Sequence, residues 1–258
     1  MSQKVTTRVS GFIGEIVISN PERKNAMSLD MWRQLRIAAD EMRANDYVRV
    51  VVVRGTNATF VAGADISEFR TMRQNGASGL EYDRITEEAL VALAQIPKPT
   101  IAAIEGYCIG GGVSVLAACD FQVSDREAKF QIPSARLGIS YPVGSLRRLV
   151  QLIGFANAKR LIFSAARISA AEALAIGLVS EVADNRVDER VDELARHLGE
   201  NAPLAVLATK KLLETISGGY EVAAERSMEL LELTLASADY AEALSAFEEQ
   251  RKPNFQGR

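Results

Sequence analysis

Short apolar runs alternate with amphipathic segments along the first half of the chain. Phe12–Ile18, Val48–Val53 and Thr100–Ile104 predict strands, and the second is so continuously apolar that we expect it to be covered on both faces. Between the first two runs, Ser28 can cap a helix with apolar residues at helical spacing. These residues are Trp32, Leu35, Ala39 and Met42. The alternation of strands and helices predicts an α/β fold.

Two Ser-x-x-Glu sequences predict capping boxes at the starts of helices. The first pairs Ser78 with Glu81, and the second pairs Ser169 with Glu172. Gly177 is expected to end the second of these helices, because glycine adopts the left-handed conformation that commonly follows a helix.

The later part of the chain has a few more short strands and then only helices. The further strands are expected at Phe121–Ser124, Lys129–Ile132 and Leu178–Val182. From Val187 to about Glu249 the pattern predicts three or four amphipathic helices. We therefore expect a core at residues 1–200 and a helical region at 201–258 that either packs on the core or joins subunits.

Composition and charge exclude several classes of protein. The 258 residues are 48% hydrophobic and 24% charged, as in a globular protein, and a net charge of −3 argues against a surface for nucleic acid. No apolar run approaches the roughly 18 residues that would indicate a membrane span. Met1–Ser10 lacks the apolar stretch of a signal peptide, so we expect a cytoplasmic protein.

The cysteines and the histidine give little sign of metal or nucleophilic chemistry. Cys108 and Cys119 have neither zinc-ligand spacing nor a disulfide context, and we interpret them as packing residues. The single histidine, His197, lies among charged residues of an amphipathic segment and is expected to be solvated. We expect no metal site and no histidine-dependent catalysis.

The glycine-rich sequence Gly110–Gly112 follows an apolar run and leads into a segment of small, helix-favouring residues. Unpaired N–H groups at the start of such a helix suit an anion or a polarised carbonyl. A tight turn with close helix packing explains three glycines equally well. Neither G-x-x-x-x-G-K-[ST] nor G-x-G-x-x-G occurs here, so the turn matches neither a phosphate loop nor a dinucleotide fold.

Five stretches, taken in order, form a recognisable set. They are FVAGADISEF at Phe60–Phe69, IAAIEGYCIGGGVSVLAACD at Ile101–Asp120, FQIPSARLGI at Phe130–Ile139, RISAAEALAIGLVSEV at Arg167–Val182 and the ending SADYAEALSAFEEQRKPNFQGR. Together they closely resemble the enoyl-CoA hydratase/isomerase family, also called the crotonase superfamily. The resemblance extends over essentially the whole chain. It implies a spiral core of ββα turns and a C-terminal helical region that packs homotrimers, commonly paired into hexamers.

The resemblance also implies an acyl-CoA thioester as substrate, with no cofactor beyond the coenzyme A of that substrate. The two backbone N–H groups that polarise the thioester carbonyl would belong to Ala64 and Gly111. Forming an enolate places negative charge on this carbonyl oxygen, and two fixed donors would stabilise it. Loop packing is the competing interpretation for both residues.

The implied coenzyme A contacts are Arg23, Lys24, Ala62, Asp65, Ile66, Lys252 and Phe255. The loop Ala62–Ile66 would meet the adenine through its backbone, and Arg23 and Lys24 would meet phosphates. Lys252 and Phe255 would reach a site from the C-terminal tail, either in their own subunit or in a neighbour. Each basic residue is equally compatible with a solvated surface charge.

The sequence departs from the family's hydratases at two positions. Those enzymes hold and activate water with two glutamates, and the matching positions here are Ser114 and Ser134. A serine hydroxyl is no general base near neutral pH without a partner base, so two-glutamate hydration is not expected. Ser114 in the first turn of a helix and Ser134 as an N-cap are structural interpretations that stay open.

A tyrosine occupies a third position from which family members project a catalytic group. Tyr141 lies in LGISYP, Leu137–Pro142, which is similar to the loop of methylmalonyl-CoA decarboxylase members. Its hydroxyl could donate a hydrogen bond or orient a carboxylate, but tyrosine is a poor base. It could instead be an aromatic plug beside Pro142. The nearest acids in sequence are Asp65, Glu68 and Glu105; we interpret Asp65 as a cap of the next helix and the other two as structural.

Three functions remain open at this point. The first is an acyl-CoA lyase or isomerase that stabilises a thioester enolate without the two glutamates. The second is decarboxylation or carbon–carbon cleavage of a 2-carboxy- or 3-oxoacyl-CoA. The third is a non-catalytic homologue that binds acyl-CoA.

Overall fold

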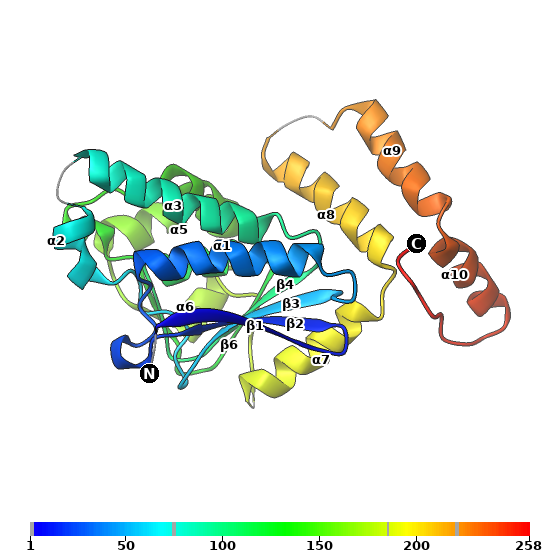
Figure 1. Cartoon of the computed structure of the whole chain (residues 1–258), viewed down its shortest axis with the longest axis horizontal. Coiled ribbons are helices and arrows are strands. Elements are labelled where there is room, and N and C mark those ends of the chain that lie inside the picture. The colour runs from blue at the N-terminus through cyan, green and yellow to red at the C-terminus, as the bar shows by residue number, and fades with distance from the viewer. Residues whose placement is uncertain (1–2, 74–75, 185, 220–221) are drawn as a thin grey trace.

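A computed structural model describes residues 3–73, 76–184, 186–219 and 222–258 of the chain (Figure 1). Its main sheet has six strands in the order β1-β2-β3-β4-β6-β9. β1 pairs antiparallel with β2, and the other neighbours are parallel. The strands are β1 (Lys4–Ser10), β2 (Ile13–Ser19), β3 (Val50–Gly55), β4 (Thr100–Ile104), β6 (Phe121–Ser124) and β9 (Glu181–Val182).

A second, three-stranded sheet lies beside the main one, in the order β5-β7-β8. Its strands are β5 (Tyr107–Ile109), β7 (Lys129–Gln131) and β8 (Ile168–Ser169). Consecutive strands of the chain therefore enter different sheets: β4 is followed by β5, then by the helix α4 (Gly111–Ala117), and then by β6 and β7. This repetition is the ββα alternation that was expected, and it places the glycine turn between the two sheets.

Helices cover both faces of the main sheet (Figure 1). α1 (Leu29–Ala44) and α3 (Gly76–Ala94) lie on one face, and α7 (Val187–Gly199) packs on β3, β4 and β6. Val51 and Val53 of β3 belong to the larger core, whereas Val50 and Val52 pack in a separate cluster with α7. The prediction that this strand is covered on both faces is confirmed.

The remaining helices follow the chain around this core. They are η1 (Pro21–Arg23), η2 (Ile66–Glu68), α2 (Phe69–Met72), η3 (Ser134–Leu137), α5 (Val143–Ser164), α6 (Ala170–Ala175), α8 (Pro203–Ser217), α9 (Ala224–Leu235) and α10 (Ala238–Glu248). Among the described residues, no helix is both long and apolar enough to cross a bilayer.

Several helix starts and ends follow the local sequence signals. The Ser28 hydroxyl accepts from Met31 N at the start of α1, and the predicted apolar face of that helix is buried. Ser169 and Glu172 form the expected capping box of α6, and Gly177 is left-handed with a φ of 79° beyond its end.

The predicted capping box at Ser78 is wrong. Helix α3 begins at Gly76, two residues earlier, so Ser78 lies inside its first turn. Glu81 instead accepts hydrogen bonds from the Arg84 guanidinium, one turn along the helix. A Ser-x-x-Glu spacing fits the interior of a first turn as well as a helix start, and here Gly76 and Ala77 also adopt helical conformation.

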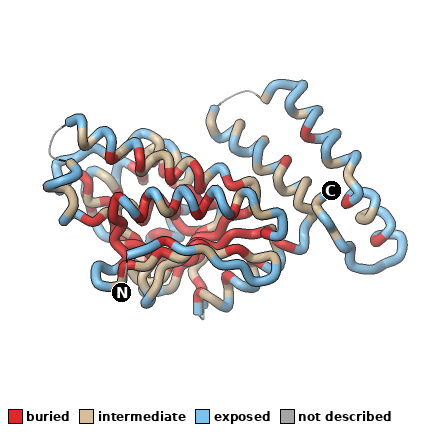
Figure 2. Tube along the Cα trace, viewed as in Figure 1, coloured by how far each residue is buried: buried red, intermediate tan, exposed pale blue. Residues whose placement is uncertain are grey.

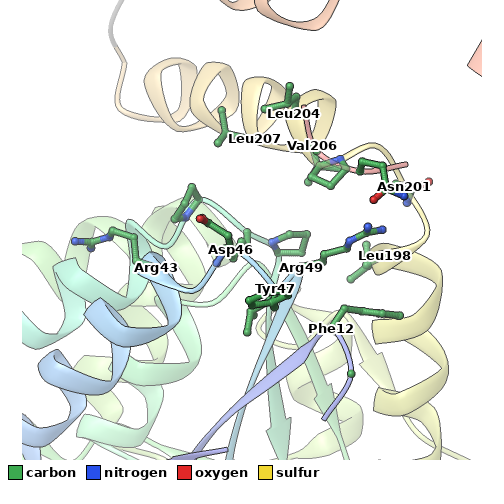
Figure 3. A pocket seen from close by; sticks show the side chains of 18 residues that line it. Phe12, Arg43, Asp46, Tyr47, Arg49, Leu198, Asn201, Leu204, Val206 and Leu207 are labelled. Atoms are coloured by element: carbon green, nitrogen blue, oxygen red, sulfur yellow. The ribbon is translucent and has the colours of Figure 1, made fainter. Parts of the chain in front are cut away.

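The C-terminal helices α8 to α10 extend away from the core and are mostly exposed (Figures 1 and 2). Large apolar side chains remain uncovered on them; Phe247, for example, is 85% exposed. A cavity of about 1030 Å³ separates α8 from the core, with Leu204 and Leu207 on one side and Tyr47 and Arg49 on the other (Figure 3). Within this chain, the appendage therefore packs little against its own core.

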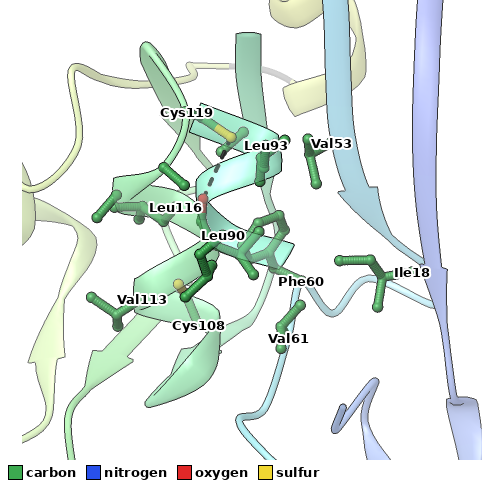
Figure 4. Packing of buried hydrophobic residues seen from close by; sticks show 14 of the residues in the cluster. Ile18, Val53, Phe60, Val61, Leu90, Leu93, Cys108, Val113, Leu116 and Cys119 are labelled. Atoms are coloured by element: carbon green, nitrogen blue, oxygen red, sulfur yellow. Dashed lines mark hydrogen bonds between the residues drawn. The ribbon is translucent and has the colours of Figure 1, made fainter. Parts of the chain in front are cut away.

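The buried thiols belong to the hydrophobic core around α4 (Figure 4). Cys108 and Cys119 are free and buried, and the Cys119 thiol contacts Val115 O at 3.5 Å. The prediction that both cysteines are packing residues is confirmed. Nearby, Gly112 lies close to Val61, which forms a β-bridge with Cys108. A Cβ added at Gly112 would lie 2.4 Å from the Val61 carbonyl oxygen.

We predict that Gly112→Ala lowers the free energy of unfolding by about 1–3 kcal/mol, because the new methyl group overpacks against backbone that cannot rotate away. The control is Gly79→Ala, whose Cβ meets nothing within 4 Å. It should stabilise the protein by up to about 1 kcal/mol through helix propensity. Urea unfolding of both variants measures the difference, and equal stabilities would contradict the packing argument.

Candidate active site

The site begins where the loop Ala62–Ala64 runs alongside β5. The Val61 N–H donates to Tyr107 O at 2.9 Å, and the Ile109 N–H donates to Val61 O at 2.9 Å. On its other side the loop is bridged to Met27. These bonds hold the loop against the segment that leads into the glycine turn.

Bonded and unbonded amide groups lie side by side at this junction. The Asp65 N–H donates to Met27 O at 2.8 Å, and the Gly110 N–H donates to Gln131 O at 2.7 Å. In contrast, the N–H groups of Ala64 and Gly111 donate to no described residue. A Cβ built on Gly111 would lie 3.7 Å from Ala64 N, so the two residues are adjacent in space.

The backbone conformation at the turn requires glycine. Gly110 precedes α4 with a φ of 51° and a ψ of −107°, a combination that residues with a Cβ rarely adopt. Gly111 then begins the helix with its N–H unpaired. The turn thus provides the start-of-helix donor that the sequence predicted, and a second donor from another loop faces the same space.

A cavity of about 140 Å³ lies in front of these donors. All five residues predicted as catalytic line it, namely Ala64, Gly111, Ser114, Ser134 and Tyr141. Residues from three separate stretches of the chain, around Ala64, around Gly111 and between Ser134 and Tyr141, are thereby brought to one small space. Its walls also include apolar side chains of α1, α2 and the loop before α5, which would exclude water from a bound acyl group.

Ser114 and Tyr141 form a hydrogen-bonded pair in the cavity wall. Ser114 Oγ lies 2.6 Å from Tyr141 Oη, which is also 3.2 Å from Gly110 O. Burial raises the pKa of Tyr141 well above its ordinary value, although the hydrogen bond from Ser114 opposes this. The Tyr141 phenol therefore stays protonated near neutral pH and is a hydrogen-bond donor, not a base.

Ser134 is buried, and its hydroxyl has no hydrogen-bond partner among the described residues. The interpretation of Ser134 as an N-cap is wrong, because η3 begins at Ser134 itself and Pro133 occupies the cap position. A buried hydroxyl without a partner is unfavourable unless a ligand or water satisfies it. By contrast, Ser114 does lie in the first turn of α4, as expected.

The loop residues predicted to bind coenzyme A lie at or near the cavity. Ala62 and Ile66 line it, and Ile66 is 58% exposed. Asp65 is buried, accepts from Ser67 N at 3.0 Å as the cap of η2, and pairs with Arg23 at 2.8 Å. The exposed Lys24 ammonium lies 4.5 Å from the centre of the Tyr107 ring. Asp65 therefore orders the loop and holds one of the two cations.

The two predicted contacts in the tail are far from this cavity. Phe255 O accepts from Arg49 at 2.6 Å, and Arg49 lines the separate, larger opening beside α8 (Figure 3). Lys252 is on the same exposed tail and comes within 4.0 Å of Glu200. The structure does not bring Lys252 or Phe255 to the cavity of their own chain.

Residues missed by the sequence analysis form the opposite wall of the cavity. Arg73, after α2, forms an ion pair with Asp83 of α3. The Arg73 guanidinium lies 5.0 Å from the Phe69 ring centre and 4.9 Å from that of Tyr82. No local motif marks Asp83, since it is one of several charges on an amphipathic helix.

A family model for enoyl-CoA hydratase/isomerase matches residues 8–258. The chain belongs to the enoyl-CoA hydratase/isomerase family. It is 34% identical to a peroxisomal Δ(3,5)-Δ(2,4)-dienoyl-CoA isomerase of Arabidopsis thaliana, over 93% of this chain and 91% of that one. It is 32% identical to the short-chain-enoyl-CoA hydratase of Clostridium acetobutylicum, over 94% and 93%.

Solved structures agree with this membership. A putative enoyl-CoA hydratase/isomerase family protein from Hyphomonas neptunium superposes with a TM-score of 0.95 at 32% identity, covering 98% of both chains. An enoyl-CoA hydratase from Bacillus anthracis gives a TM-score of 0.90 at 30% identity, covering 99% of this chain and 100% of that one. The α/β core with its helical C-terminal region is thus the crotonase fold, as the sequence predicted.

We predict that Gly111→Ala lowers kcat by about 10²- to 10³-fold on any thioester that the protein turns over, as much as the loss of one oxyanion donor, although the N–H at position 111 remains. The new methyl group would press on the Trp32 ring, 3.0 Å away, and so displace this amide from its place beside Ala64. Ser114→Ala should cost less than about tenfold, because Tyr141 keeps its contact with Gly110 O. Steady-state kinetics compares the two, and equal losses would contradict this ranking.

Proposed function

We propose that this protein transforms an acyl-CoA thioester through an enolate, with the carbonyl oxygen bound by the N–H groups of Ala64 and Gly111. The observation that carries the proposal is that these two amides are adjacent in space and donate to no described residue. Donors that are already fixed stabilise developing oxyanion charge without reorganisation. The family membership supports an acyl-CoA as the source of that carbonyl.

Hydration of a 2-enoyl-CoA by paired glutamates is not the proposed reaction. Ser114 and Ser134 stand where those carboxylates would be. Ser114 is bonded to protonated Tyr141, and the Ser134 hydroxyl is bonded to no residue that the structure describes, so neither has a base beside it there. This leaves reactions in which the enolate is formed by proton transfer or bond cleavage without an activated water.

Decarboxylation of a 2-carboxyacyl-CoA is the second candidate, favoured by the Ser114–Tyr141 pair. A protonated phenol in a buried wall can donate to a substrate carboxylate and orient the bond that breaks, while the two amides hold the resulting enolate. Loss of CO₂ needs no base. Carbon–carbon cleavage of a 3-oxoacyl-CoA would place charge on the same oxygen.

A panel of thioesters separates these functions. Purified protein is incubated with 3-enoyl-, 2-enoyl-, malonyl-type and 3-oxoacyl-CoA, and products are identified by liquid chromatography with mass spectrometry. Double-bond migration supports proton transfer, and CO₂ release supports decarboxylation. Tight acyl-CoA binding without turnover of any member would refute both and favour the non-catalytic homologue.

We also propose that the C-terminal helices join subunits into a homotrimer, or a hexamer made of two trimers. Their large exposed apolar side chains and the cavity between α8 and the core are what a partner subunit would cover. In such an assembly, Lys252 and Phe255 would contact a neighbour's coenzyme A. The cytoplasmic location stays a prediction, since the Arabidopsis relative is named as peroxisomal.

We predict that Phe247→Glu combined with Leu244→Glu, both on exposed α10 positions, shifts the protein to smaller species by burying charge in the interface. Light scattering coupled to size-exclusion chromatography measures the mass. The control is Ile37→Glu on α1, which is similarly exposed and should leave the mass unchanged. A stable monomer of the unsubstituted protein would refute the proposed assembly.

We predict that the protein hydrates crotonyl-CoA at least about 10²-fold more slowly than a two-glutamate hydratase, the typical contribution of a general acid–base group. Ser114→Glu with Ser134→Glu should raise this rate more than either change alone. Ser134 has an unpartnered hydroxyl on the cavity, whereas glutamate at 114 must displace Tyr141. Loss of crotonyl-CoA absorbance measures hydration, and efficient hydration by the unsubstituted protein would contradict the proposal.

A further inference from the structure

Asp83 is the only carboxylate among the described residues that line the 140 Å³ cavity. It projects from α3, and Thr86, three positions further along the same helix, lines the cavity with it. Ala64 and Gly111, whose amides are described above, also line this cavity. The carboxylate and the two amides therefore border the same cavity.

The other acids near the site in sequence are occupied elsewhere. Asp65 caps η2 and pairs with Arg23, and Glu68 accepts from Leu29 N at 2.8 Å. Glu105 does not line the cavity, and its charged neighbours include Asp188 and Asp125. None of these groups is available to a bound acyl chain.

Arg73 fixes the Asp83 carboxylate in the cavity wall. The guanidinium is held over the rings of Phe69 and Tyr82 and forms the ion pair with Asp83. The Asp83 side chain is still 39% exposed, so its proton can exchange with solvent. Burial raises the pKa of Asp83 above its ordinary value, and the Arg73 charge opposes this rise. A carboxylate with a raised pKa is a stronger base than an ordinary aspartate.

The same cavity contains further polar side chains that lack partners. Ser134 Oγ, Ser145 Oγ and Thr86 Oγ1 are buried and bonded to no described residue, and Ser134 and Ser145 are only 6% and 1% exposed. Burying hydroxyls without partners is unfavourable in a site that only packs. These three groups indicate a cavity built around a polar ligand.

We propose that Asp83 is the catalytic base of this site, taking a proton from the carbon next to the thioester carbonyl, with Arg73 as the residue that positions it. This rests on the proposed function, because the base is useful only if Ala64 and Gly111 stabilise the enolate. It assigns a proton-transfer role to a residue of α3 and makes a 3-enoyl-CoA a suitable substrate.

The proton transfer balances without any further reactant. The C2–H bond breaks as the Asp83 O–H bond forms, and the electron pair moves into the enolate held by the two amides. The C3=C4 double bond then shifts to C2=C3 as Asp83 returns the proton to C4. A 3-enoyl-CoA becomes a 2-enoyl-CoA, and the carboxylate is regenerated.

Exchange of the C2 hydrogens of butanoyl-CoA for deuterium in D₂O tests the base directly, because this saturated thioester can only enolise. Proton nuclear magnetic resonance follows the loss of the C2 signal. We expect exchange by the unsubstituted protein and a decrease of about 10²- to 10⁴-fold in Asp83→Asn, the usual contribution of a general base. Butanoyl-CoA affinity should change less than about threefold.

Matched variants separate a base from a structural acid. Glu81→Gln, on the same helix but exposed and paired with Arg84, should exchange at the unsubstituted rate. Asp83→Ala with added formate should recover exchange, because formate supplies a carboxylate in the vacated space. Thermal melts of each variant identify any that fail to fold, and Asp83→Glu, which keeps the carboxylate, should retain part of the activity.

The positioning role of Arg73 has its own readout in the pH profile of exchange. Removing its charge in Arg73→Met should raise the Asp83 pKa and move the acid-side loss of activity to higher pH. Burial raises the pKa of the neighbouring Tyr82 to about 12, above this range. Glu87, one turn further along α3, is paired with Arg148 of α5. An unchanged midpoint would overturn this role.

The outcomes distinguish the two levels of the proposal. Exchange in Asp83→Asn within threefold of the unsubstituted rate would overturn the assignment of Asp83 while leaving enolate formation intact. Absence of exchange in the unsubstituted protein would overturn both. Exchange that is lost in Asp83→Asn, restored by formate and unaffected in Glu81→Gln supports both.

Discussion

The site depends on one constraint, that the amides of Ala64 and Gly111 are held side by side without acceptors. Two separate segments must meet for this to happen. The loop Ala62–Ala64 is bonded to β5 on one side and bridged to Met27 on the other, and β5 leads directly into the turn. Because the backbone itself supplies the donors, the proposed oxyanion site is built into the fold rather than into exchangeable side chains.

The close packing around α4 follows from the same constraint. Gly112 brings the helix against Val61 with no space for a Cβ, and the Trp32 ring fills the space beside Gly111. The cavity that results is small, is lined largely by apolar groups and includes the hydroxyls of Ser114, Ser134 and Tyr141. In the proposed function, this space stabilises charge on a thioester and does not activate water.

Much of this arrangement could be predicted from the sequence, where local signals or motif order determine it. Ser28 caps α1, and the glycine turn begins α4, because both depend on neighbouring residues. The misplaced start of α3 shows the limit of a short motif when the preceding residues also fit the helix. The short strand β8 and the place of Asp83 depend on how distant segments pack, which no local pattern encodes.

The central claim is that the two free amides polarise a thioester carbonyl, and the vibrational spectrum of a bound acyl-CoA tests it most directly. Butanoyl-CoA labelled with ¹³C at the carbonyl is bound to the protein, and infrared difference spectroscopy isolates its C=O stretch. Two hydrogen bonds in a site shielded from water should shift this stretch below its position in aqueous solution, and Gly111→Ala should reverse most of the shift. A stretch at or above the aqueous position in the unsubstituted protein would contradict the account.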